Sequence, residues 1–183
     1  HLILALLIYA YTIWVALTLW QNLGFSITLS WLSGLSGSLV VLIFITAFTG
    51  ALVAGLDAGL TYNTFPLMDD DFLPEGMLRM RPIYINFFEN ITTVQFNHRI
   101  LAIITSIFSF GLWFYCRTTC GSKNIVRAMN YLILVVITQV ALGIFTLLLV
   151  VPLPIAALHQ AMAVVLLGCA IWVLRESIIS VKN

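Results

Sequence analysis

The chain has 183 residues, of which 62% are hydrophobic and only 8% are charged, and its formal net charge is +1. A soluble domain carries about 25% charged residues, so this composition excludes a soluble globular protein and predicts an all-α, polytopic membrane protein surrounded by lipid. The near-neutral charge, without a basic stripe, also excludes a nucleic-acid partner.

Five apolar runs follow one another along the chain, and each is long enough to cross a bilayer as a helix. We expect the spans at Leu2–Trp20, Ser38–Leu56, Thr92–Cys116, Ala128–Val151 and Ile155–Leu174. The link 21–37 is uncharged and rich in Gly and Ser, and the link 57–91 is the only long one. Pro152 to Pro154 predict a tight turn. The chain opens on an apolar run without an initiator Met, so we expect upstream sequence to be missing.

The charged residues of the links predict how the spans are oriented. The link between the third and fourth spans and the C-terminus hold most of the basic residues: Arg117, Lys123, Arg127, Arg175 and Lys182. The 57–91 loop holds most of the acidic ones: Asp57, Asp69, Asp70, Asp71, Glu75 and Glu89. By the positive-inside rule the basic ends face the cytoplasm or matrix, and the acidic loop faces outside.

Three histidines lie at the outer end of three different spans. His1 opens the first run, His98 precedes the run 100–116, and His159 lies within the uncharged run 155–174. An imidazole inside a bilayer needs a partner because contact with lipid is costly. Two neutral imidazoles on facing helices can hold a haem iron from both sides. We therefore predict that His98 and His159 ligate a haem iron. His1 would need a partner on a helix not present here. The alternative is that the histidines form structural hydrogen bonds or a proton relay.

Several polar and small residues near these histidines are further candidates. Arg99 is a possible cationic partner for a haem propionate, or it extends to the interface. Gln95 and Gln160 are possible hydrogen-bond donors around the ligands. The small residues of 50–59 either allow close helix packing or leave room for a flat ligand. The three cysteines do not form a disulfide framework.

The first and last runs share a weak internal echo. The same spacing relates a His, an Ala and a Trp in each run: His1, Ala5 and Trp14 against His159, Ala163 and Trp172. Residues 139–143, in the run before His159, also loosely match residues 50–52. Internal repeats are common in membrane folds, so the echo suggests a duplicated helical unit of which one copy is truncated.

Several motifs together resemble the haem A synthase family. Residues 50–59 and 62–68 are similar to the family's outer loop, 88–90 and 94–99 to its sixth helix, and 138–139, 142–144, 146–148, 151–152 and 157–160 to its seventh and eighth. The similarity covers nearly all of Ser38 to Leu174. It implies a division into 1–37, the last helix of a truncated N-terminal half with a connecting loop, and 38–183, a C-terminal four-helix haem b domain with the outer loop 57–91.

The resemblance also implies a reaction. Members of the family are oxidoreductases that convert the C8 methyl of haem O to the formyl group of haem A, which terminal cytochrome c oxidase uses. His98 and His159 match ligands of an electron-transferring haem b, and His1 matches one ligand of the substrate haem iron. The family's Glu-x-x-His stretch has no counterpart here, so we expect no catalytic residue in this fragment, which alone would be inactive.

The resemblance further implies a location and partners. The host membrane would be the bacterial cytoplasmic membrane or the mitochondrial inner membrane. Haem O synthase and terminal oxidase assembly factors are the partners that it suggests, and the electron partner stays unidentified.

Two other classes of function fit the residues. One is a di-histidine b-type cytochrome that only carries electrons, and the other is a haem-free membrane scaffold or transporter. The segment Asn63 to Pro66 within the long loop favours the synthase, because a simple carrier does not need a long ordered outer loop.

Overall fold

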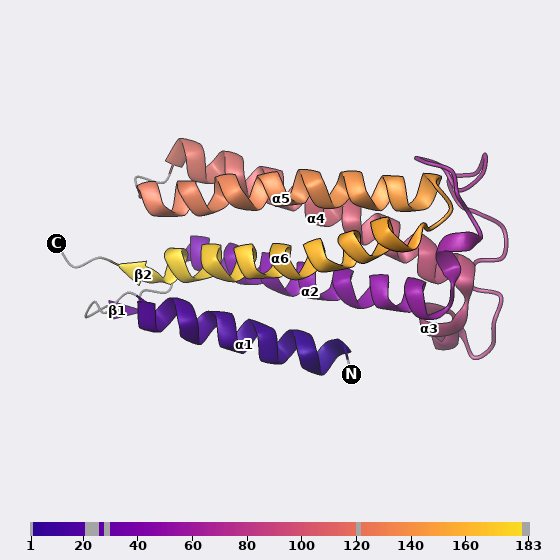
Figure 1. Ribbon diagram of the computed structural model, residues 1–183, viewed down its shortest axis with the longest axis horizontal. Coiled ribbons are helices and arrows are strands. Elements are labelled where there is room, and N and C mark those ends of the chain that lie inside the picture. The colour runs from indigo at the N-terminus through magenta and orange to yellow at the C-terminus, as the bar shows by residue number, and fades with distance from the viewer. Residues whose placement is uncertain (1, 21–25, 28–29, 120–121, 181–183) are drawn as a thin grey trace.

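The computed structural model describes residues 2–20, 26–27, 30–119 and 122–180. Five of its helices are long and apolar enough to cross a membrane: α1 (Leu2–Trp20), α2 (Trp31–Gly55), α4 (Ile91–Thr119), α5 (Lys123–Leu148) and α6 (Leu153–Ile178). They alternate in direction along one long axis (Figure 1). The prediction of an all-α, polytopic membrane protein with five spans is confirmed.

The beginning of α2 was predicted wrongly. The helix begins at Trp31 instead of Ser38, because Ser30 and Ser33 form a reciprocal cap. The Ser30 hydroxyl accepts from the Ser33 amide at 3.2 Å, and the Ser33 hydroxyl accepts from the Ser30 amide at 2.8 Å. This capping box satisfies amides at the helix start that have no helical partner. The Gly- and Ser-rich composition of this stretch therefore conceals the first two turns of a spanning helix.

The other helix ends also differ from the expected bounds. The α4 helix extends from Ile91 to Thr119, so little of the predicted basic link is a loop. The turn expected at Pro152 to Pro154 lies earlier, at 149–152, since α5 ends at Leu148 and α6 begins at Leu153. Pro154 lies in the first turn of α6, where its missing N–H would have had no helical acceptor.

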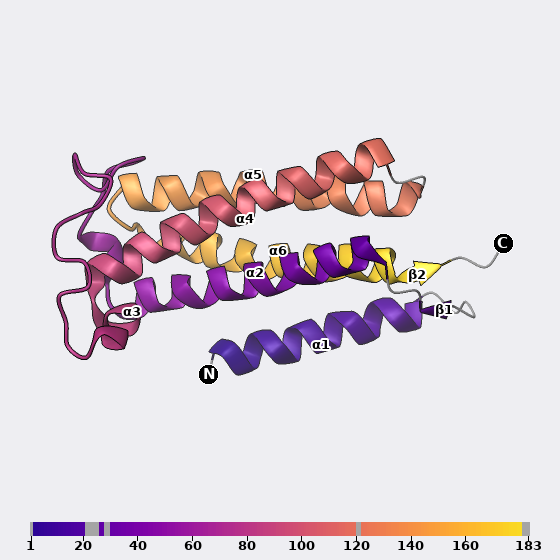
Figure 2. The same cartoon turned by 180° about the vertical axis from the view of Figure 1, so that it is seen from behind.

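Four helices form a bundle, and α1 lies outside it. The α2 helix packs against α4 and α6, and α5 also packs against α4 and α6 (Figures 1 and 2). The helices α4 and α6 therefore lie on one diagonal of the bundle. The α1 helix lies along α6 and also contacts α2. A short antiparallel pair, β1 (Ser26–Ile27) with β2 (Ile179–Ser180), joins the chain before α2 to the end of α6.

The apolar core occupies one half of the bundle. In α2 the buried residues lie between Ser33 and Ile43, and in α5 they lie between Ile125 and Val136. The buried residues of α6 begin only at Leu166. All three sets lie at the end near the α4–α5 link. In the described residues of these helices, the other half of the bundle has no fully buried side chain.

The charged residues are divided between the two ends as predicted. Arg117, Lys123 and Arg127 lie where α4 passes into α5, and the acidic loop lies at the opposite end (Figure 1). Arg175 lies at the basic end but is not a solvated charge: its side chain is 3% exposed and lies 3.3 Å from a carboxylate oxygen of Glu176. We expect this end of the bundle to face the cytoplasm or matrix.

The long loop between α2 and α4 is folded onto the helix ends. It contains η1 (Ala58–Leu60), η2 (Ile83–Ile85) and the short α3 (Asn86–Glu89). The side-chain amide of Asn63 donates to the carbonyls of Gly59, at 2.7 Å, and Leu147, at 3.0 Å, which ties the loop to the end of α5. The buried Asn86 donates to the carbonyls of Met80 and Ile83 and accepts from the Met80 amide.

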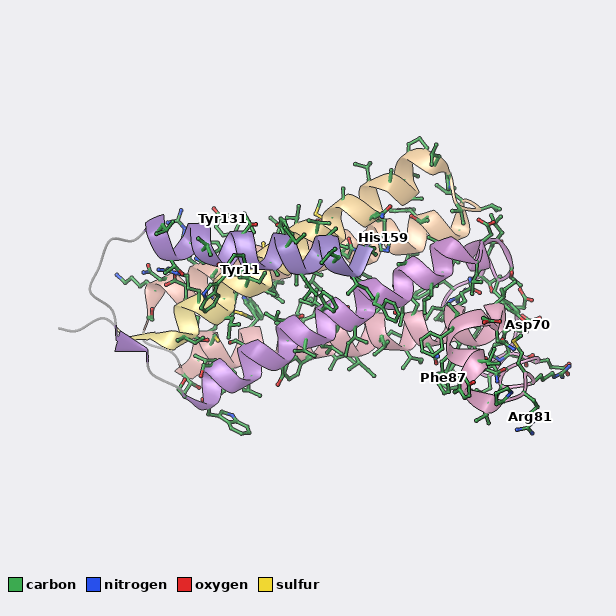
Figure 3. All side chains as sticks on the ribbon, turned by 90° about the horizontal axis from the view of Figure 1, so that it is seen from below. Tyr11, Asp70, Arg81, Phe87, Tyr131 and His159 are labelled. Atoms are coloured by element: carbon green, nitrogen blue, oxygen red, sulfur yellow. The ribbon has the colours of Figure 1, made fainter. Side chains whose placement is uncertain are left out.

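The charged residues of this loop face solvent. Asp70 and Arg81 lie with Phe87 at the far end of the molecule (Figure 3). Asp57 is exposed and makes no side-chain cap bond, so it is a solvated charge.

Candidate functional site

The two candidate ligands lie inside helices that occupy one diagonal of the bundle. The α4 helix begins at Ile91, one residue before the expected Thr92, and places the His98 imidazole about two turns inside. The Asn90 side chain caps this earlier start by accepting from the Thr93 amide at 2.9 Å. His159 lies a similar distance inside α6, at the same end of the bundle (Figure 3). His1 lies outside the described residues.

The His98 ring contacts two neighbouring residues of α2. Its Nδ1 lies 3.1 Å from the hydroxyl of Thr49. That hydroxyl donates to the Thr46 carbonyl at 2.9 Å, so it accepts the proton of Nδ1. The ring edge lies against Gly50: a Cβ at this glycine would be 3.0 Å from Cε1, 3.5 Å from Nδ1 and 3.6 Å from Nε2.

The His159 ring has the same surroundings on α5. Its Nδ1 lies 3.2 Å from the backbone carbonyl of Gln139, which can only accept. The ring edge lies against Gly143, where a Cβ would be 2.9 Å from Cε1, 3.4 Å from Nδ1 and 3.5 Å from Nε2. Each histidine thus packs against a glycine of the helix that precedes it in the bundle.

The two arrangements are equivalent in sequence as well as in space. The Thr46 backbone also hydrogen-bonds the His98 ring, and Thr46 precedes Gly50 by the interval that separates Gln139 from Gly143. The pairs α2–α4 and α5–α6 therefore repeat one structural unit. This repeat is not the one that the sequence echo suggested: the echo matched the first run with the last and residues 139–143 with 50–52, whereas Gly50 in the structure corresponds to Gly143.

This arrangement leaves the same nitrogen free on both rings. The Thr49 hydroxyl and the Gln139 carbonyl both lie against Nδ1 of their ring, so Nε2 is the nitrogen that carries an available lone pair. A hydrogen bond from Nδ1 to a protein oxygen is the usual support of a metal-ligating histidine.

The set of ligands suits haem better than a bare metal ion. In the described ranges no cluster of three or more His, Cys, Asp and Glu side chains could hold a metal. A haem iron needs only two axial ligands from the protein, because the porphyrin supplies the other four. The half of the bundle that contains His98 and His159 is also the half without fully buried side chains in α2, α5 and α6.

Arg99 and Gln95 hold the outer loop. The Arg99 guanidinium donates to the carbonyls of Tyr62, Thr64 and Leu67 at 2.8, 2.8 and 3.1 Å. The Gln95 amide donates to the same Tyr62 carbonyl at 3.0 Å. The Nε of Arg99 and the Oε1 of Gln95 are buried and have no hydrogen-bond partner among the described residues. Arg99 is therefore bound to the loop and does not extend freely to the interface.

The remaining candidates, Gln160 and the small residues of 50–59, contribute less to the site around the two histidines. Gln160 is exposed next to His159. Of the small residues in 50–59, Gly50 faces an imidazole, whereas a Cβ at Gly59 would lie 3.0 Å from Val151. A Cβ at Gly55 would meet nothing within 4 Å, so these glycines do not form a single face.

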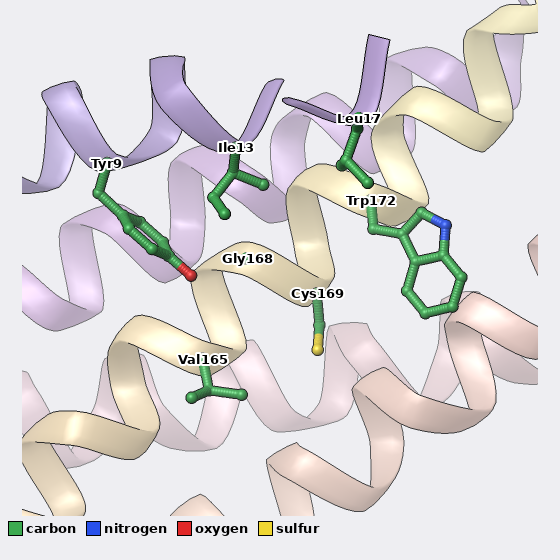
Figure 4. Close-up of a pocket in the computed structure, with 7 residues that line it drawn as sticks. All are labelled: Tyr9, Ile13, Leu17, Val165, Gly168, Cys169 and Trp172. Carbon is green, nitrogen blue, oxygen red and sulfur yellow. The ribbon is translucent and has the colours of Figure 1, made fainter. Parts of the chain in front are cut away.

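A separate apolar groove lies between α1 and α6 (Figure 4). Its volume is about 250 Å³, and seven residues line it: Tyr9, Ile13, Leu17, Val165, Gly168, Cys169 and Trp172. The Tyr9 hydroxyl points at the bare backbone of Gly168, where a Cβ would lie only 2.5 Å from that oxygen. None of these seven residues is a histidine, and neither His98 nor His159 is among them, so the groove is distinct from the candidate site.

The sequence did not identify Thr49, Gly143 or the Gln139 carbonyl as parts of the site. The available signal was a glycine on the helix preceding each histidine, with a hydrogen-bonding residue one turn earlier. That signal is readable only after the neighbouring helices are known.

Comparisons with known proteins agree with the resemblance. Residues 1–171 match the family model COX15-CtaA, described as cytochrome oxidase assembly protein. Heme A synthase of Nitrosospira multiformis is 45% identical over 179 residues, covering 96% of this chain and 50% of that protein. Heme A synthase COX15 of Mus musculus is 41% identical over 179 residues, covering 96% and 43%. The chain thus spans about half the length of the curated relatives it matches, and no solved structure matches it.

Proposed function

The chain belongs to the COX15-CtaA family of cytochrome oxidase assembly proteins, and from this premise we propose that it acts in haem A synthesis. The proposed reaction is oxidation of the C8 methyl of haem O to the formyl group of haem A, for use in terminal oxidase. The bundle of α2, α4, α5 and α6 would hold a haem b between His98 and His159. The single observation that carries this proposal is the pair of imidazoles with Nδ1 bonded and Nε2 free.

The residues around the histidines fit a flat, two-sided cofactor. Gly50 and Gly143 let each ring lie flush against a neighbouring helix, which a side chain at either position would prevent. The hydrogen bonds at Nδ1 would fix the orientation of each ring and leave Nε2 as the nitrogen that binds iron. When bound, haem supplies an iron that changes oxidation state and can transfer single electrons.

Of the flanking residues, Arg99 would contact both the haem and the outer loop, whereas Gln95 would contact mainly the loop. The buried Nε–H of Arg99 has no acceptor, and a propionate carboxylate would supply one. The free Oε1 of Gln95 is itself an acceptor, so it cannot bind an ionised propionate, and we assign Gln95 mainly to the loop. Gln160 stays a proposed donor near His159. His1 would ligate the iron of the substrate haem.

The wider assignments extend this proposal. Residues 38–183 would form the haem b domain and transfer electrons, while residues 1–37 would belong to the part that binds haem O. The protein would lie in a bacterial cytoplasmic or mitochondrial inner membrane and work with haem O synthase and oxidase assembly factors.

A visible absorption spectrum of the purified protein tests the haem site. We expect a low-spin b-type spectrum that His98→Ala and His159→Ala each abolish while the helical circular dichroism stays unchanged. Haem content equal to wild type in both variants would refute the site. Haem A formation in a host without its own synthase then tests the reaction: bound haem without haem A would favour the electron carrier, and no bound haem would favour the scaffold.

A further inference from the structure

Both candidate ligands face a backbone acceptor of the preceding helix, Thr46 for His98 and Gln139 for His159, and His98 has a side-chain hydroxyl beside Nδ1 in addition. His159 donates to a backbone carbonyl, that of Gln139 at 3.2 Å. The closest side-chain acceptor of His98 is the Thr49 hydroxyl at 3.1 Å. In other respects the two rings are placed alike, each against a glycine of the neighbouring helix. The hydroxyl of Thr49 is thus the principal difference between them.

The direction of the hydrogen bonds around Thr49 is determined by its neighbours. Thr49 has one hydroxyl proton, and it donates this proton to the Thr46 carbonyl at 2.9 Å. Its oxygen is therefore left to accept from Nδ1 of His98. Hydrogen bonds in such a chain polarise and strengthen one another. The Thr49 hydroxyl therefore favours the His98 tautomer that leaves Nε2 unprotonated.

A second hydroxyl pair holds the same region of α2 against α4. The Thr46 hydroxyl donates to the Leu42 carbonyl at 2.8 Å and lies 2.8 Å from the hydroxyl of Thr105. Because the single proton of Thr46 is already used, Thr105 is the donor in this pair. Thr105 is 5% exposed. This bond joins the two helices without touching the imidazole, which makes Thr105 a matched control.

We propose that Thr49 is a positioning residue that sets the tautomer of His98 and makes the two axial ligands unequal. This inference rests on the proposed haem site. A hydrogen bond from Nδ1 raises the basicity of a ligating imidazole, and a more basic ligand stabilises ferric iron more than ferrous iron. Loss of the Thr49 hydroxyl should therefore raise the midpoint potential of the bound haem.

The test is a redox titration of the haem-loaded protein, followed by its visible spectrum, in four forms: wild type, Thr49→Val, Thr49→Ser and Thr105→Val. Thr49→Val keeps the shape of the side chain and removes the acceptor, whereas Thr49→Ser restores the hydroxyl. We expect Thr49→Val to shift the Fe(III)/Fe(II) equilibrium several-fold toward Fe(II), where tenfold corresponds to about 59 mV for one electron. Thr49→Ser and Thr105→Val should stay near the wild-type potential.

Each of the other outcomes either supports or overturns the inference. A wild-type potential in Thr49→Val, or an equal shift in Thr105→Val, would overturn the inference, since the effect would then be absent or due to helix packing. If Thr49→Val retains no haem, normal loading of Thr49→Ser supports the role of the hydroxyl, and loss of haem from both overturns it. Absence of haem from the wild type would instead refute the proposed site, and the inference with it.

Discussion

Replacement of Gly143 by alanine should leave the stability of the haem-free protein near that of wild type and lower its affinity for haem. The new Cβ would lie 2.9 Å from Cε1 of His159, whereas carbon atoms in contact are ordinarily about 3.5–4.0 Å apart. The imidazole must therefore move by at least about 0.6 Å. Metal–ligand distances tolerate only about 0.2 Å, so a ring displaced this far no longer presents Nε2 where haem iron requires it.

The substitution has two effects of opposite sign, one on helix propensity and one on the position of the His159 ring. Alanine in a helix interior is favoured over glycine by about 1 kcal/mol, and this gain offsets the cost of the clash with His159 in the haem-free protein. If the His159 ring escapes the clash by leaving its rotamer, the cost is about 0.5–1.5 kcal/mol. About 1.4 kcal/mol corresponds to a tenfold change in affinity, so we expect a tenfold weaker haem complex or none.

Two measurements on the detergent-solubilised protein check this prediction. Titration with haem, followed by visible absorption, gives the affinity, and thermal unfolding of the haem-free form gives the stability. Gly111→Ala is the matched control, because a Cβ at Gly111 in α4 would meet nothing within 4 Å. A Gly143→Ala variant that binds haem as tightly as wild type would refute the argument, and so would a Gly111→Ala variant with equally weakened binding.

Three further predictions concern the loop and the topology. Arg99→Ala should weaken haem retention by about 1–3 kcal/mol and expose the loop to protease; intact haem binding would remove its propionate role. Asn63→Ala should lower the free energy of unfolding by about 1–2 kcal/mol, because two backbone carbonyls lose a donor, and an unchanged melting temperature would contradict this. In a cysteine-free background, Asp70→Cys and Lys123→Cys should be labelled by an impermeant reagent from opposite sides of the membrane, and labelling from one side would refute the topology.

The spans could be predicted from sequence because the property that defines them is local. Hydropathy summed over one run is enough to identify a spanning helix, and all five were found. The start of α2 was missed because Ser30 and Ser33 form a cap through side-chain hydrogen bonds, which hydropathy does not register. Composition that is rich in Gly and Ser indicates a loop in soluble proteins, yet here it lies in a lipid-spanning helix.

The site was predictable only in part, because its remaining members come from other helices. Histidines within apolar runs are conspicuous, so His98 and His159 could be selected directly. Gly50, Gly143 and Thr49 become meaningful only when α2 is known to contact α4, and α5 to contact α6. Which helices are adjacent depends on how the bundle packs, and this cannot be predicted from a single sequence.

The apolar core is confined to one half of the bundle, and this should affect how long the protein survives in the cell. The half that contains the histidines has no fully buried side chain in α2, α5 or α6, so a bound haem would serve there as the missing core. A ligand at 100 times its Kd stabilises the folded state by about 2.7 kcal/mol. If the proposed site holds haem, cells short of haem should degrade this protein faster, and its abundance should follow the haem supply.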